Sequence, residues 1–164
     1  MKIRSAAFVI ALCAASLPQA AQANWHSTQW GQTVDQVIKA GKSELKTRKL
    51  ADNPENYQAQ MPCLAEGEST EFGLKVKVRF CFKPDSRTLA LVQLIPVDPW
   101  RNSSFEEFLL HQYGTTKIHT MTDPADGSNW RQMDWPLANG DLVRLTEVSK
   151  DAGEGFIWTV RKVG

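Results

Sequence analysis

The sequence predicts an α+β fold: one domain in which two helices pack on one face of an antiparallel β-sheet. Two observations lead to this expectation. Apolar residues occupy every second position between residues 72 and 82, and a second apolar run follows at 88–96. The expected order of elements is helix, strands, helix, strands, whereas a doubly wound parallel sheet needs helices and strands to alternate singly.

The central feature of the sequence is a predicted hairpin. One side of its first strand carries the apolar residues Phe72, Leu74, Val76, Val78, Phe80 and Phe82. Lys75, Lys77, Arg79 and Cys81 alternate with them, and a period of two is typical of a strand with one buried face and one solvent face. Residues 83–87 include Pro, Asp and Ser, which favour a turn, so the run at 88–96 is expected to return antiparallel to the first strand.

The two helices are predicted from capping boxes. Thr33 and Gln36 mark the start of the first helix, which is expected to end at Asp52, Asn53 and Pro54. Ser104 and Glu107 mark the start of the second, which is expected to end at residues 113–114. The remaining expectations are strands at 57–64, 130–135, 141–148 and 155–163, a polar turn at 65–70, a loop at 123–129, and a tight turn at Asn139-Gly140.

The first 23 residues have the features of a secretory signal peptide. Lys2 and Arg4 precede a short apolar run at 8–12, and the small residues Ala21 and Ala23 mark a cleavage site after Ala23. We therefore expect residues 24–164 to form a periplasmic or secreted domain without a transmembrane segment. The formal net charge of +1 gives no reason to expect nucleic acid as a partner.

Two cysteines lie beyond this segment, Cys63 and Cys81. Because an exported protein meets an oxidising compartment, we expect them to form a disulfide, which is worth about 3 kcal/mol in the chain-entropy model. There is no Cys-x-x-Cys motif to suggest redox chemistry. Cys81 falls on the solvent side of its predicted strand, so the bridge should lie on the outer side of the sheet or at its edge.

Three short segments resemble a known superfamily. Residues 30–37 resemble its W-G-M-S/T-x-x-E-V helix start, with Gln32 where Met is usual; the hairpin resembles its F-x-F and L-x-x-V strands; and residues 109–114 resemble its L-x-x-x-Y-G helix end. The superfamily comprises outer-membrane assembly lipoproteins of the SmpA/OmlA type and β-lactamase-inhibitor-like domains. The resemblance implies helices on an antiparallel sheet, a protein-binding or envelope-assembly role and no catalytic residues. This chain differs in lacking a good acylation cysteine.

Motifs for catalysis are missing from the sequence. His26, His111 and His119 have no metal-ligand spacing, and neither a nucleophile elbow nor a phosphate-binding loop is present. Glu106 and Glu107 are adjacent on the second predicted helix and point apart. The expected function is therefore non-enzymatic binding of another envelope protein, without a cofactor.

A metal-binding function is the alternative. After cleavage at Ala23 the chain would begin Asn24-Trp25-His26. Its terminal amine, two backbone nitrogens and the third-position imidazole can form a square-planar site of the kind that Cu(II) or Ni(II) prefers.

Two groups of residues are candidates for partner binding. Lys75, Lys77 and Arg79 project from one face of a strand about 7 Å apart and could receive an acidic partner, or they could simply keep that face soluble. Trp100 and Trp130 lie beside loops, where an exposed indole marks an interface, although such a side chain can also pack back onto its own domain.

Overall fold

The computed structural model describes residues 26–42, 46–53, 57–58, 60–71, 73–98, 102–125, 127–150 and 153–162. The expected signal peptide and the residues Asn24, Trp25 and Trp100 lie outside these ranges. Within them, no helix is long and apolar enough to cross a membrane.

Two helices and nine strands follow one another along the described chain. In order they are α1 (Val34–Gly41), β1 (Arg48–Lys49), β2 (Tyr57–Gln58), β3 (Met61–Glu71), β4 (Leu74–Phe82), β5 (Leu89–Pro96), α2 (Asn102–Tyr113), β6 (Ile118–Thr122), β7 (Asn129–Pro136), β8 (Asp141–Lys150) and β9 (Gly153–Lys162). All strand pairs are antiparallel, and the order across the sheet is β1-β3-β4-β5-β9-β8-β7-β6, with β2 pairing to β3. The predicted antiparallel α+β class is confirmed.

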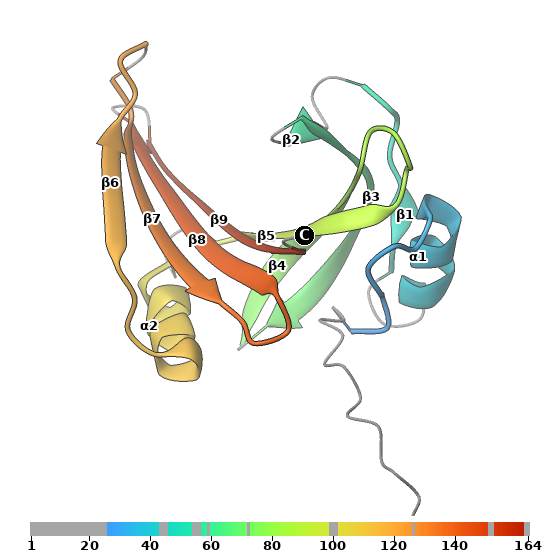
Figure 1. Cartoon of the computed structure of the whole chain (residues 1–164), viewed down its shortest axis with the longest axis horizontal. Helices are drawn as coiled ribbons and strands as arrows, with labels where there is room; N and C mark the ends of the chain where they lie inside the picture. Colours follow the sequence, from blue (N-terminus) through green and yellow to red (C-terminus); the bar gives the residue numbers. More distant parts are fainter. Residues whose placement is uncertain are drawn as a thin grey trace, which may run out of the picture.

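The sheet consists of two arms that join at its centre. We call α1 with β1–β5 the N-terminal arm and α2 with β6–β9 the C-terminal arm. Figure 1 shows a curved sheet whose arms diverge from the junction of β5 and β9, with α1 beside β1 and β3 and α2 near the C-terminal arm. Each arm is thus a helix followed by a run of antiparallel strands, and the strand order runs outward from the junction in both directions.

The predicted central hairpin is confirmed from Leu74 onward, and Phe72, where its first strand was expected to begin, lies outside the described residues. The hairpin comprises β4 and β5, and Val76, Val78 and Phe80 are all fully buried, whereas Lys75 and Lys77 are exposed. The buried residues belong to one apolar core that also includes Val37 of α1 and six residues of the C-terminal arm, namely Phe105, Leu109, Met133, Trp135, Val143 and Leu145. Both helices therefore contribute to this core, while the expectation that they cover a single face of the sheet stays a prediction.

The first helix is much shorter than predicted. It begins as expected, with the backbone N–H of Thr33 donating to Oε1 of Gln36 (2.8 Å), but it ends at Gly41. There the chain folds back: Thr47 Oγ1 donates to the carbonyl of Ile38 (3.1 Å), and a Cβ at Gly41 would lie 2.6 Å from the Thr47 methyl. This return places Arg48 and Lys49 in β1, although their sequence neighbourhood favours a helix.

Three further expectations about elements are corrected. Residues 65–70, predicted as a polar turn, lie inside β3, because they pair along their whole length with β4. The second helix begins at Asn102 and not after Ser104, although it ends at Tyr113 with Gly114 at φ +82° as expected. The strand β6 was not predicted. The turn at Asn139-Gly140 is found between β7 and β8, with Gly140 at φ +83°.

Candidate functional site

One face of the sheet carries the charged side chains that the sequence singled out. Residues directly opposite each other in antiparallel strands point to the same side. Arg79 of β4 pairs with Glu66 of β3 and with Gln93 of β5. Across the next strands, Gln93 pairs with Thr159 of β9, which pairs with Arg144 of β8, and Arg144 pairs with Asp134 of β7. These residues form one row across the sheet. We call the side that bears this row the charged face; the fully buried core residues of β4 point to the other side.

Ion pairs occupy both ends of this row. In the N-terminal arm, Nε of Arg48 donates to Oε1 of Glu66 (2.9 Å). In the C-terminal arm, Arg144 makes two hydrogen bonds to Asp134, from Nε to Oδ1 and from Nη2 to Oδ2, both 2.7 Å long. These charges therefore largely neutralise each other within the protein.

The centre of the row is different. Gln93 is only 1% exposed, and its Oε1 is buried without a hydrogen-bond partner among the described side chains. Nε of the half-buried Arg79 is also buried and, among the same side chains, without a partner. Each such atom costs about 1–3 kcal/mol relative to a hydrogen-bonded one. An unpaired donor and an unpaired acceptor thus lie on directly opposed residues in the middle of the sheet.

Lys75 and Lys77 precede Arg79 at alternate positions of β4 and are exposed. Within the part of the chain that the structure describes, none of the three cations forms an ion pair, even though Lys77 is paired in register with Glu68. The predicted alternation therefore does bring them onto one face. We call Lys75, Lys77 and Arg79 the basic cluster.

The predicted disulfide is present on the same face. Cys63 and Cys81 are bonded and lie directly opposite each other on β3 and β4. The bridge lies on the side away from the main core, as expected, but it is not exposed: the two cysteines are 1% and 0% exposed and form a small apolar cluster with Leu91 and Met61. Apolar residues of β3 and β5 thus cover this end of the charged face.

Of the two tryptophan candidates, Trp130 lies on β7, away from the basic cluster on β4. Trp130, on β7, is half-buried, and its Nε1 donates to Oγ of Ser128 (2.9 Å). Its polar edge is therefore satisfied by its own loop, although the residue lines a hollow at the end of the C-terminal arm together with Met121 and Glu147. The other candidate, Trp100, lies outside the described residues.

Of the three residues in the candidate metal site at 24–26, only His26 lies among the described residues. Its Nε2 lies 2.9 Å from Oε1 of Glu71, near the end of β3. In the described ranges no three His, Cys, Asp or Glu side chains are grouped so that they could hold a metal ion.

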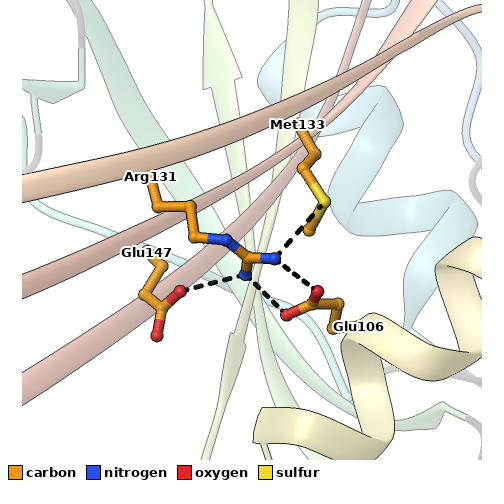
Figure 2. Close-up of polar contacts among 4 residues, drawn as sticks. All are labelled: Glu106, Arg131, Met133 and Glu147. Carbon is orange, nitrogen blue, oxygen red and sulfur yellow. Dashed lines mark hydrogen bonds and ion pairs between the residues drawn. The ribbon is translucent and has the colours of Figure 1, made fainter. Parts of the chain in front are cut away.

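A cluster that sequence reasoning missed fixes α2 to the sheet (Figure 2). The guanidinium of Arg131 on β7 donates to both carboxylate oxygens of Glu106 on α2 (2.6 and 2.7 Å) and to Glu147 on β8 (3.2 Å). The hydrogen bond from Arg131 holds the pKa of Glu106 below its ordinary value, against the opposing effect of burial. The same contact with Glu106 raises the pKa of Arg131. The spacing of these residues in the sequence gives no sign of the cluster, because three separate elements supply it.

The geometry defines a class but not a family: an antiparallel α+β protein with one apolar, helix-associated core and a charged opposite face. No protein-family model, curated protein or solved structure matches this chain.

Proposed function

We propose that this chain is an exported, non-enzymatic module that binds an acidic surface of another envelope protein through its charged face. The observation that carries the proposal is the basic cluster: three cations on one strand, unpaired among the described residues, beside ion pairs that are already neutralised. Because the chain as a whole is nearly neutral, this cluster is a local feature of one face and not the result of a general basic excess.

The exposure of the basic cluster supports the same proposal. Lys75 and Lys77 are exposed, whereas Nε of Arg79 and Oε1 of Gln93 are buried, so the two lysines are the groups that a partner can reach. Asp or Glu residues of the partner would face Lys75 and Lys77. The resemblance to envelope-assembly proteins, which the short motifs suggest, agrees with this role.

The test begins with a photo-crosslinking residue placed at Lys77 in intact cells, and the same residue placed at Lys39 on α1 as a control. A specific partner should be captured from position 77 only. The purified partner should then bind the mature chain with an affinity that falls as salt rises, because exposed charges are screened over about 8 Å at physiological ionic strength.

Charge variants make this test specific. Lys75→Glu with Lys77→Glu should weaken binding of the captured partner at least about tenfold, since two favourable contacts become repulsive. Lys39→Glu with Lys42→Glu changes the net charge by the same amount on exposed positions of α1 and its end, and should leave binding unchanged. Equal effects of the two double variants would contradict docking on the charged face.

A metal-binding function at residues 24–26 is the second candidate. One observation favours it: Nε2 of His26 faces the carboxylate of Glu71, and metal-bound imidazoles commonly present their second nitrogen to a carboxylate. Titration of the mature chain with Cu(II) at neutral pH should give a visible absorption band at one equivalent. If the band survives His26→Ala, the imidazole is not a ligand and this candidate fails.

A further inference from the structure

The strand β6 forms one edge of the sheet, opposite the edge formed by β1. It is the outermost strand of the C-terminal arm in Figure 1, and among the described residues it pairs only with β7. All five of its residues are exposed, including Ile118 at 52% and Met121 at 59%. The opposite edge ends in β1, which has only two residues. An exposed strand edge with apolar side chains is where another strand can add.

A hydrogen bond at the end of β6 shows which of its residues direct their backbone N–H and C=O groups toward β7. The N–H of Asp123, the residue after the strand, donates to the carbonyl of Ser128 (2.8 Å), and β6 pairs with β7 in an unbroken register up to Thr122 and Asn129. Inward and outward positions alternate along an antiparallel strand. The backbone groups of Ile118, Thr120 and Thr122 therefore point away from β7, toward the open edge.

These outward positions are centred on Thr120, which gives the edge a self-complementary pattern. If a second β6 approaches antiparallel about a two-fold axis at Thr120, Thr120 pairs with its own copy and Ile118 with Thr122. The next pair places Lys117 of each chain opposite Asp123 of the other. Two opposite-charge contacts and about six backbone hydrogen bonds would form together.

We propose that β6 is a self-association edge, through which two copies of this chain join their sheets into one continuous antiparallel sheet. The added strand is β6 of a second copy, because the outward backbone groups and the opposite charges of Lys117 and Asp123 are both arranged symmetrically about Thr120. A contact limited to one short strand buries little surface, so the dimer should be reversible, with a dissociation constant of roughly micromolar to millimolar. This edge is distinct from the charged face and leaves the basic cluster accessible.

The first test is sedimentation equilibrium of the purified chain and of two proline variants. Thr120→Pro removes an N–H that points outward, so the variant should keep the stability of the monomer and lose the dimer. Met121→Pro removes an N–H that bonds to β7, so it should lower the stability of the monomer itself. A chain that is monomeric up to millimolar concentration, or a dimer that Thr120→Pro leaves intact, would show the proposal to be wrong.

Variants that exchange the charges of Lys117 and Asp123 provide an independent test. Lys117→Glu alone and Asp123→Lys alone each place like charges opposite each other twice, and each should weaken self-association by about tenfold or more. A mixture of the two variants restores opposite charges at both contacts, so a heterodimer of wild-type affinity should appear. Asp123 also accepts a hydrogen bond from the N–H of Ala125 (2.8 Å), so near-UV circular dichroism should first establish that each variant is folded. Failure of the folded variants to form the heterodimer would contradict the two-fold register.

Discussion

The two arms of the sheet share a topology but are held together by different means. In the N-terminal arm a disulfide joins β3 to β4, and α1 packs with Val37 fully buried and Gly41 against Thr47. In the C-terminal arm, whose described residues include no cysteine, α2 is held by buried Phe105 and Leu109 and by the ion pairs of Arg131. The N-terminal arm ends in a two-residue strand, whereas the C-terminal arm ends in the fully exposed β6.

This difference teaches that one arm can be reinforced by a covalent link between its strands and the other by ion pairs between its helix and its strands. A short loop closed by a disulfide constrains the unfolded chain, and its effect responds to reductant. An ion pair with a half-buried carboxylate acts in the folded state, and its effect responds to pH. The stability of the two arms should therefore respond to different solution conditions, and four sets of substitutions compare them.

The largest effect is expected from the apolar anchors of the helices. Phe105→Ala should lower the free energy of unfolding by about 3–5 kcal/mol, because it removes a fully buried aromatic side chain. Val37→Ala, the matched change in α1, removes two methyl groups and should lower it by about 2 kcal/mol. Urea denaturation measures both values. A larger loss for Val37→Ala would mean that α1 is the more important helix.

The disulfide should have the next largest effect. Cys63→Ala with Cys81→Ala opens a loop with a sequence separation of 18 residues and should lower the free energy of unfolding by about 3 kcal/mol. Reductant should destabilise the wild type to the same extent and leave the double variant unchanged. In amide hydrogen exchange, β3 and β4 should lose protection first. Simultaneous loss of protection in β7 and β8 would show that the arms open as one unit.

Arg131→Gln tests the electrostatic attachment of α2. At pH 7 the variant should lose about 1–3 kcal/mol, because Glu106 is left ionised and partly buried without its partner. The folded-state pKa of Glu106 lies below its unfolded value, so the ion pair stabilises the protein above pH 4.5, the ordinary pKa of that carboxyl, and its contribution is lost as pH falls through the folded-state pKa. Urea titrations at pH 7 and pH 3 should show the two proteins converging in acid. A constant difference would assign the loss to packing.

The smallest effects are expected at the ion pairs of the charged face. Arg48→Ala should lower the free energy of unfolding by about 1 kcal/mol, because the Arg48 side chain is 75% exposed but its partner Glu66 is only 10% exposed and is left without that partner. Arg144→Ala should cost a similar amount, since Arg144 and Asp134 are each 27% exposed. A double-mutant cycle for each pair measures the interaction energies directly. A coupling energy near zero for the Arg48 pair would show that Glu66 does not depend on Arg48.

Sequence periodicity predicted those parts of the fold in which one strand face is buried and the other is wet. It gave the alternation of β4, the return of β5 and the placing of Lys75 and Lys77 on the opposite face from Val76 and Val78. It failed for residues 65–70, because Gly67 and Ser69 favour turns and Glu68 is uncommon in strands, so that this segment forms a strand only between neighbouring strands. It also missed β6, since a short strand that is exposed on both faces has no apolar period.

The charged face was only half predictable. The spacing of Lys75, Lys77 and Arg79 within one strand is a local property, so sequence alone could group them. The pairing of Arg79 with Gln93, and of Arg144 with Asp134, depends on the register within the hairpins β4–β5 and β7–β8, and the alignment of the two pairs across the sheet depends on β9. The Arg131 cluster likewise needs α2, β7 and β8 to be placed together before it can be recognised.

The junction of the two arms sets an order for assembly. The inner edge of β5 pairs with β9, the last strand of the described chain, through residues 91–94 and 158–161. During synthesis from the N-terminus, Val92 and Leu94 therefore lie at an unpaired edge of the sheet until β9 has been made. Truncation near the C-terminus would remove a central strand and not a peripheral one. The newly made chain would then expose apolar surface at the seam, where chaperones and proteases recognise unfinished proteins.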